Sequence, residues 1–306
     1  MQCIEGWDLP EAAGPSRHRL WAALGIGACL AAVAIDAIVI EPRRVALEEV
    51  EIPIWDLPDA FDGYRIAIIS DSHFPRWTSK KYIHRCIAMA NGFRPDLIVI
   101  LGDICDRAWR QSAEVPNLAG VFDPACARDG ILGVLGNHDH RFDMERLRQE
   151  FADRTPVHLI ENTSVYLERG SALLAIGGVG DLWHGRVAPY QTFENVPPEI
   201  PRILLSHNPD LAERFPADIR VDLQLSGHTH GGQVCFPPGH AIHVPSLYGN
   251  KYRAGLVEGR RHRVYISRGI ASSHLVRFCC PPEVSAITLR KSSDLRYAPW
   301  NVSASE

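Results

Sequence analysis

Short polar motifs directly follow five apolar segments of this 306-residue chain, and this succession constrains the fold more than any other feature. The segments are rich in valine, isoleucine and leucine, as buried strands are. They are Tyr64–Ser70, Asp96–Leu101, Ile131–Leu135, Arg202–Ser206 and Asp222–Ser226. Helices are expected over Lys80–Asn91, Asp143–Ala152 and Pro209–Phe215. Strands that alternate with helices, without an internal repeat, predict a layered α/β fold.

The motifs that follow the five strands are DSH, GDICD, GNHD, HNPD and GHTH, which begin at Asp71, Gly102, Gly136, His207 and Gly227. In layered α/β sheets the carboxyl ends of the strands meet at one edge, where ligands bind. We therefore expect the five loops to share one site. A helix would carry His228 and His230 to different faces, whereas an extended, glycine-flanked turn aims both rings into the same pocket.

The motifs supply a mixed set of nitrogen and oxygen ligands: Asp71, His73, Asp103, Asn137, His207, His228 and His230. Such a set suits divalent manganese, iron, zinc, cobalt or nickel. Seven ligands are too many for one ion, so we expect two ions about 3.5 to 4 Å apart, bridged by a carboxylate and a hydroxide. Two cations, two carboxylates and one hydroxide sum to about +1, which matches a phosphodiester, and this arrangement is typical of phosphoester hydrolysis.

The amino-terminal segment Leu20–Ile40 is apolar except for Asp36. As a helix it is long enough to cross a bilayer core of about 30 Å, and we interpret it as a single membrane anchor. Three alternatives are a signal peptide cleaved after Ala32–Ala34, a lipid-modified Cys29 and a buried helical hairpin. The apolar run continues past both processing points, which favours the anchor.

Charge and cysteine content narrow the class of partner and the compartment. The net charge of −4 and the absence of a lysine-rich run argue against a nucleic-acid partner. The eight cysteines form no CxxC pair, which indicates reduced thiols. We therefore expect a single-pass protein of the cytoplasmic (inner) membrane with its catalytic domain on the cytoplasmic face. Arginine pairs flank both ends of the anchor, so the positive-inside rule does not choose the side.

The expected domain organisation has five parts. Residues 1–19 form an amino-terminal tail, 20–40 the transmembrane anchor and 41–58 an acidic, proline-bearing linker. The catalytic domain spans 59–292, and 293–306 form a carboxy-terminal tail.

The motifs DxH, GDxxD, GNHD, a lone histidine and GHxH, in this order, resemble those of calcineurin-like metallophosphoesterases over about Ala60–Arg290. The flanking segments Pro245–Leu256 and Ser267–Arg290 are similar to a membrane-associated bacterial branch of that family. Some members of this branch, or close to it, cleave the pyrophosphate of UDP-2,3-diacylglucosamine in lipid A biosynthesis. The resemblance implies a four-layer αββα sandwich, here tethered by an amino-terminal transmembrane helix.

The resemblance also implies roles for individual residues. One metal ion would be held by Asp71, His73 and His230, the other by Asn137, His207 and His228, with Asp103 bridging them. Manganese, iron and zinc all fit these ligands. A bridging hydroxide would attack phosphorus in line.

Residues next to these ligands are assigned supporting roles by the same resemblance. His138 would donate a proton to the leaving group or stabilise its charge, with Asp139 orienting the imidazole ring. Asp106 fits a carboxylate behind the ligands, and Arg107 a contact to the substrate phosphate.

The sequence thus predicts a metal-dependent hydrolase of a lipid-linked phosphodiester or pyrophosphate, such as UDP-2,3-diacylglucosamine. Two alternatives remain: a broad-specificity phosphodiesterase or phosphatase on soluble esters, and a non-catalytic metal-binding scaffold. Each of five further residues has two interpretations, a role at the pocket or a structural one: Asp181, Trp183, His240, His243 and Arg277. The other histidines receive no role: His84, His140, His158, His184, His262 and His274.

Overall fold

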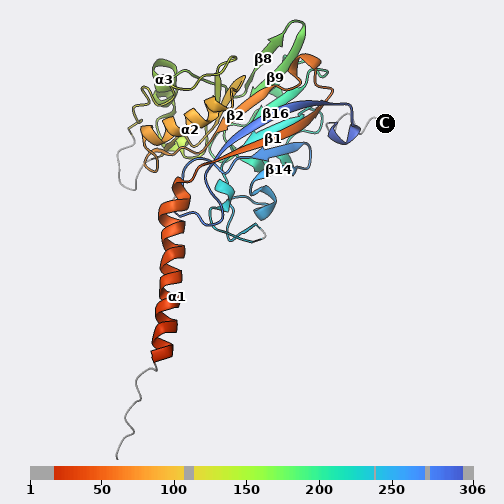
Figure 1. Cartoon of the computed structure of the whole chain (residues 1–306). Helices are drawn as coiled ribbons and strands as arrows, with labels where there is room; N and C mark the ends of the chain where they lie inside the picture. The colour runs from red at the N-terminus through yellow and green to blue at the C-terminus, as the bar shows by residue number, and fades with distance from the viewer. Residues whose placement is uncertain (1–16, 107–113, 238, 273–275, 299–306) are drawn as a thin grey trace, which may run out of the picture.

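The computed structural model describes residues 17–106, 114–237, 239–272 and 276–298. Two six-stranded sheets form its centre (Figure 1). The first has the order β1 (Ala46–Trp55), β16 (Glu283–Ser292), β2 (Arg65–Ile69), β4 (Leu97–Leu101), β6 (Ile131–Val134) and β7 (Val157–Leu159). The second has the order β14 (Gly255–Glu258), β15 (Arg263–Ile266), β11 (Leu223–Ser226), β10 (Arg202–Leu205), β9 (Ala172–Gly178) and β8 (Thr163–Arg169). The five strands predicted from the sequence are confirmed as β2, β4, β6, β10 and β11.

The two sheets pack face to face over a common apolar core. Alternate residues of a strand point to opposite faces, so Ile66 and Ile68 of β2 enter the core between the sheets. Ala67 and Ile69 of the same strand enter the core beneath the outer helices. A strand buried on both faces is continuously apolar, which explains why the predicted segments have no polar alternation.

Helices α2 (Lys80–Gly92) and α3 (Met144–Arg154) cover the outer face of the first sheet. Buried Ile83, Ile87 and Ala90 form the inner stripe of α2 at helical spacing. The side chain of Ser79 caps α2 by accepting from the Tyr82 N–H. The other outer layer contains α4 (Pro189–Thr192), the 3-10 turn η5 (Pro209–Glu213) and loops. The four-layer sandwich is thus confirmed, but the helix expected at Pro209–Phe215 is a 3-10 turn too short to form regular α-helix.

The structure places a strand where a linker was expected. Strand β1 pairs in parallel with β16 along its whole length, from Ala46 opposite Glu283 to Trp55 opposite Ser292. Only its second half is deeply buried, through Ile52 and Ile54. The acidic first half and a proline are tolerated because β1 is an edge strand, and these residues conceal it in the sequence.

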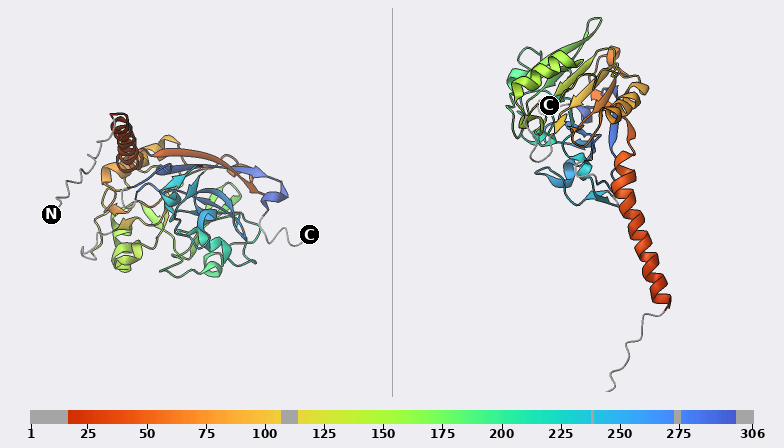
Figure 2. Two further views of the ribbon diagram at one scale, coloured as in Figure 1. Left: turned by 90° about the horizontal axis from the view of Figure 1, so that it is seen from below. Right: turned by 90° about the vertical axis from the view of Figure 1, so that its left-hand side faces the viewer.

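The amino-terminal helix α1 (Arg17–Ile35) projects away from the body of the molecule (Figures 1 and 2). A π-helical stretch (Asp36–Ile40) and the 3-10 turn η2 (Glu41–Arg43) connect it to β1. Its large apolar side chains, such as Trp21, Leu24 and Leu30, are exposed. By length and composition, it is a helix that could cross a membrane.

Candidate metal centre

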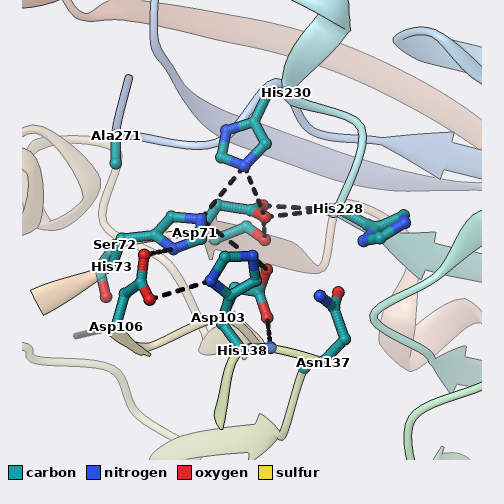
Figure 3. A network of polar contacts seen from close by, with 12 residues as sticks. Asp71, Ser72, His73, Asp103, Asp106, Asn137, His138, His228, His230 and Ala271 are labelled. Atoms are coloured by element: carbon teal, nitrogen blue, oxygen red, sulfur yellow. Dashed lines mark hydrogen bonds and ion pairs between the residues drawn. The ribbon is translucent and has the colours of Figure 1, made fainter. Parts of the chain in front are cut away.

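The structure brings all seven predicted metal ligands together at one edge of the two sheets. Figure 3 labels six of them, all except His207. Strands β2, β4 and β6 of the first sheet are mutually parallel, as are β10 and β11 of the second. The loops that follow their carboxyl ends supply the ligands, each of which is buried: Asp71, His73, Asp103, Asn137, His207, His228 and His230. The fold therefore brings the five loops together at one site, as predicted from the sequence.

The first cluster contains Asp71, His73 and His230, whose ligand atoms all lie within 4.8 Å of one another. His230 Nε2 is 3.5 Å from Asp71 Oδ1 and 3.2 Å from His73 Nε2. Asp71 accepts from the backbone N–H of His228 at 3.1 Å, which joins the loop after β2 to the loop after β11. The two sheets are thus connected at the site.

The second cluster contains Asp103, His207 and His228, again with ligand atoms within 4.8 Å. His207 Nε2 lies 3.3 Å from Asp103 Oδ2, 3.2 Å from His228 Nδ1 and 3.2 Å from Asn137 Oδ1. Asp103 Oδ2 is also 3.8 Å from His73 Nε2 of the first cluster. The Asp103 carboxylate therefore lies between the two clusters, where a bridging ligand would be placed.

Five ligand residues have left-handed backbone conformations, with φ of 55° at Asp71, 45° at His73, 46° at Asp103, 70° at His228 and 51° at His230. Such residues cost about 1 kcal/mol or more each, and they gather at functional sites where the surrounding fold holds them. These turns direct the side chains of nearby loop residues, such as His228 and His230, toward one centre, which helix geometry does not allow.

Two glycines permit the close packing of the ligand loops. A Cβ at Gly136 would lie 2.4 Å from both the backbone nitrogen and Oδ1 of Asp103. A Cβ at Gly227 would lie 2.5 Å from Asp71 Oδ2. Both glycines belong to the sequence motifs because no side chain fits between these loops.

The hydrogen-bonding pattern of His207 fits a cation at the centre. Its Nδ1 donates to the Leu101 carbonyl at 2.7 Å, so in the neutral ring Nε2 carries a lone pair. That lone pair faces the oxygens of Asp103 and Asn137 and Nδ1 of His228. Electron-rich atoms at these distances are satisfied by a positive charge among them.

The pKa shifts of the ligand residues also indicate a site that favours positive charge. Burial lowers the pKa of His207, but the Asp103 carboxylate outweighs burial and raises it to about 10. Burial and the nearby Asp103 charge raise the pKa of Asp71, although the neighbouring histidines and Ser70 oppose them. Burial lowers the pKa of His228 to about 3, with the charge of His207 acting in the same direction. Without a metal ion, the site therefore holds a positive charge on His207, at the place where a bound cation would otherwise supply it, whereas His228 stays neutral.

His138 lies beside the ligands but is more exposed than they are. Its backbone N–H donates to Asp103 Oδ1 at 2.7 Å, and its Nδ1 lies 3.1 Å from Asp106 Oδ1. Arg141 Nη2 is 3.3 Å from His138 Nε2, and Arg141 Nη1 is 3.4 Å from Asp106 Oδ1. The ring therefore presents Nε2 to the pocket while Asp106 holds the opposite nitrogen.

The orienting role expected for Asp139 is not the one that the structure shows. The Asp139 carboxylate accepts backbone N–H bonds from Cys105 at 2.7 Å, Gly136 at 2.8 Å and Ile104 at 3.2 Å. It therefore fixes the loops after β4 and β6 relative to each other. Asp106, expected only as a carboxylate behind the ligands, is the acidic partner of His138.

A pocket of about 570 Å³ opens over the two clusters. Its lining includes the polar ligands His73, Asp103 and Asn137 and an apolar group, here called the rim, that consists of Trp183, Val234, Ile242, Pro245 and Val276. The Trp183 ring meets the His228 ring edge to face, with centroids 4.3 Å apart. His243 also lines the pocket, whereas His240 is exposed on β13 (His240–Ala241) and is not a lining residue.

The remaining candidates divide between structural and pocket positions. Arg107 and His274 lie outside the described residues. Arg277 is fully buried, and its guanidinium donates to the carbonyls of Ala271, Arg268, Cys280 and His230, so it supports the loops rather than lining the pocket. Asp181 accepts from the backbone N–H groups of Trp183 and His184 and thereby shapes the Trp183 turn.

Sequence reasoning missed Arg141, a cationic side chain that lines the pocket. The available signal was its position three residues after His138 in the GNHDHR segment, because the 3-10 turn η4 (Asp139–Arg141) places residues three apart on the same side.

Comparisons with known proteins agree with this geometry. The calcineurin-like phosphoesterase family model matches residues 64–232. The metallophosphoesterase YkuE of Bacillus subtilis is 31% identical over 260 residues, covering 83% of this chain and 88% of the relative. The phosphodiesterase YaeI of Escherichia coli is 31% identical over 229 residues, covering 74% and 82%. The UDP-2,3-diacylglucosamine pyrophosphatase LpxG of Chlamydia trachomatis is 27% identical over 287 residues, covering 75% and 85%. The chain belongs to the calcineurin-like phosphoesterase family and is a metal-dependent phosphoester hydrolase.

Proposed function

We propose that this protein is a membrane-anchored hydrolase that uses two divalent metal ions to cleave a lipid-linked phosphodiester or pyrophosphate of the UDP-2,3-diacylglucosamine class. One observation carries the proposal: a pair of buried ligand clusters opens into a pocket with an apolar rim, next to the end of α1. A polar phosphate group and an apolar chain would each find a matching part of that pocket.

We assign Asp71, His73 and His230 to one ion, Asn137, His207 and His228 to the other, and Asp103 to both. This assignment follows the two clusters, and manganese, iron and zinc all fit the ligands. When bound, two such ions supply an activated water at neutral pH and the positive charge that stabilises a phosphoryl transition state.

The residues of the chain itself perform the proton and orientation steps. His138 presents Nε2 to the pocket and would donate a proton to the leaving oxygen. Asp106 Oδ1 lies 3.1 Å from His138 Nδ1 and orients the ring. Arg141 would contact a phosphate oxygen, a role for which its guanidinium geometry is suited.

Three features support a lipid-linked substrate at the cytoplasmic face. The rim residues Trp183, Ile242 and Val276 offer an apolar surface beside the phosphate site. LpxG, which resembles this chain over most of its length, is a UDP-2,3-diacylglucosamine pyrophosphatase. The described cysteines are free, as expected of a domain in a reducing compartment.

The direct test uses the purified full chain, loaded with manganese, and micellar UDP-2,3-diacylglucosamine. The proposal predicts release of UMP that requires the metal and disappears in Asp103→Ala. A mono-aryl and a bis-aryl phosphate are assayed in parallel. If the soluble esters are cleaved far faster than the lipid-linked pyrophosphate, the lipid-linked assignment is wrong.

The second candidate is a broad-specificity phosphodiesterase on soluble esters. It is favoured by the similarity to the phosphodiesterase YaeI, which at 31% identity exceeds the 27% identity to LpxG. The same three substrates separate the two candidates. A metal-loaded chain that hydrolyses none of them would contradict both candidate substrate classes.

A further inference from the structure

We propose that four exposed side chains beside the pocket form a membrane-contact patch that inserts into the interface of the bilayer crossed by α1. These side chains are Phe236, Ile242, Leu247 and Tyr248. The partner of this patch is the lipid bilayer itself. The contact does not depend on which phosphoester is cleaved, but it deepens the proposed function because it places the pocket mouth at the lipid surface.

The first argument is exposure. Ile242 and Leu247 are each 70% exposed, Phe236 is 51% and Tyr248 is 39% exposed. Outside α1, most large apolar side chains of the described body are buried, whereas four within the segment 236–248 are exposed. A concentration of exposed apolar side chains in one short segment is typical of an interaction surface.

The second argument is position. The segment that carries the patch includes β12 (Cys235–Phe236), β13 (His240–Ala241) and η7 (Gly249–Tyr252). In Figure 1 this cyan-to-blue segment lies below β14, on the side of the body from which α1 projects. The right-hand view of Figure 2 shows the same segment beside the upper end of α1. A bilayer crossed by α1 would therefore meet this segment.

The third argument is a direct connection between the patch and the anchor. The Arg277 N–H donates to the Ala37 carbonyl at 2.9 Å, and the Cys280 N–H donates to the Glu41 carboxylate. Phe278 lies between these two residues and forms backbone hydrogen bonds with the patch segment. Its N–H donates to the Gln233 carbonyl at 2.8 Å, and its carbonyl accepts from the Cys235 N–H at 2.9 Å. Because one short stretch contacts both elements, the depth of the patch relative to α1 is fixed.

The backbone beneath the patch is held by further bonds, so its exposure is not that of a frayed loop. The Asp210 carboxylate accepts from the Ser246 hydroxyl and, at 2.8 Å, from the Leu247 N–H. The Asn250 side chain bonds both the N–H and the carbonyl of Ala241. The exposed apolar side chains are therefore carried on a fixed backbone, as in an interfacial element that contacts lipid, and the exposed His240 and His243 belong to the same segment.

The composition of the patch and its surroundings suits the bilayer interface. Aromatic and aliphatic side chains partition into the boundary between head groups and acyl chains. Arg43 and Arg44 lie at the body end of the anchor, where basic side chains meet anionic lipid head groups. Ile242 belongs both to the patch and to the pocket lining, so a lipid could extend its head group to the metal centre while its chains stay in the membrane.

The test compares Leu247 with Leu295, an exposed leucine in the 3-10 turn η9 (Leu295–Tyr297), which directly precedes the C-terminal end of the described chain. Figure 1 shows the C-terminus on the side of the body away from α1. Each position receives p-benzoylphenylalanine in the full chain, which is reconstituted into phosphatidylethanolamine–phosphatidylglycerol vesicles that contain an alkyne-bearing phosphatidylethanolamine. After irradiation and coupling of a fluorophore to the alkyne, lipid attached to the protein is measured on a gel. We expect labelling at position 247 to be several-fold stronger than at 295. Labelling at 247 no stronger than at 295 overturns the proposal.

A second arm measures the consequence for turnover. Leu247→Glu is expected to retain hydrolysis of bis(p-nitrophenyl) phosphate but to slow cleavage of vesicle-borne UDP-2,3-diacylglucosamine, whereas the matched Leu295→Glu changes neither. Equal rates of Leu247→Glu and wild type on the vesicle-borne substrate would contradict the patch. Failure of the proposed function looks different, because the wild-type chain would then cleave no lipid-linked substrate while lipid labelling at 247 persists.

Discussion

Asp106 connects His138 to His73: its Oδ1 lies 3.1 Å from His138 Nδ1 and its Oδ2 lies 3.5 Å from His73 Nδ1. The buried carboxylate thus holds two imidazoles, one assigned to proton transfer and the other to metal binding. Burial raises the pKa of Asp106, but contacts from His138 and His73 outweigh it and hold the pKa well below the ordinary value. Asp106 is consequently ionised and can accept a hydrogen bond from Nδ1 of His138, which orients the ring.

His138→Ala should lower kcat while leaving the metal content unchanged. General acid catalysis by a positioned histidine contributes about 10²- to 10⁴-fold, and the side chain of His138 is not among the assigned ligands. The measurement is steady-state hydrolysis together with elemental analysis of the same sample. His158→Ala, at an exposed position on β7, is the matched control. Loss of metal from His138→Ala would show that its role is misassigned.

Asp139→Ala should destabilise the fold rather than remove a catalytic group. It leaves three buried backbone N–H groups without their acceptor, at a cost of about 1–3 kcal/mol for each group that stays unsatisfied. Asp143→Ala, which removes the exposed cap of α3, should cost only about 0.5–2 kcal/mol. Denaturant unfolding of the metal-free chains measures both. An Asp139→Ala chain as stable as wild type would contradict the loop-fixing role.

Gly136→Ala should disrupt the metal centre. The new methyl group would lie 2.4 Å from the backbone nitrogen of Asp103, so the loop that carries the proposed bridging ligand must move. We expect lost metal and lost turnover with the rest of the fold retained. Gly92→Ala is the control, since a Cβ there meets nothing within 4 Å. Unchanged metal content in Gly136→Ala would show that the loops do not depend on this close approach.

His262 should make the chain less stable in acid. Its Nε2 lies 2.8 Å from Gln224 Oε1, and burial lowers its pKa to about 3. The unfolded histidine has a pKa of about 6.5, so the stability contributed by a neutral His262 is full above that pH and is lost as the pH falls toward 3. The predicted slope is about 1.4 kcal/mol per pH unit in that window.

The matching experiment compares wild type with His262→Gln, both without metal so that the ligand histidines contribute equally. The stability difference between the two chains should shrink as the pH falls below about 6.5. A difference that is independent of pH across this window would show that His262 does not remain neutral in the folded chain.

The centre of the fold and its ligands could be predicted because they follow from local patterns. Continuous apolar segments identify buried strands, and ligand side chains directly after them must lie at the carboxyl edge. The contacts among the loops could not be predicted in this way. Asp106 and Asp139 both lie in ligand loops, and only the three-dimensional packing shows that the first holds His138 and the second holds backbone N–H groups.

Strand β1 was missed for a different reason. Its acidic residues and Pro53 are typical of a linker, and its stability comes from pairing with β16, which lies more than two hundred residues later in the chain. A pairing over such a distance leaves no local signal. Arg141 was missed similarly, because its approach to the pocket depends on the turn that follows His138.

The most direct test of the account is the number of metal ions that the full chain binds. Elemental analysis after reconstitution with manganese should find about two ions per chain, with both sites weakened in Asp103→Ala because this carboxylate lies between the clusters. A correctly folded wild-type chain that binds one ion or none, yet still hydrolyses phosphoesters, would contradict the two-metal centre.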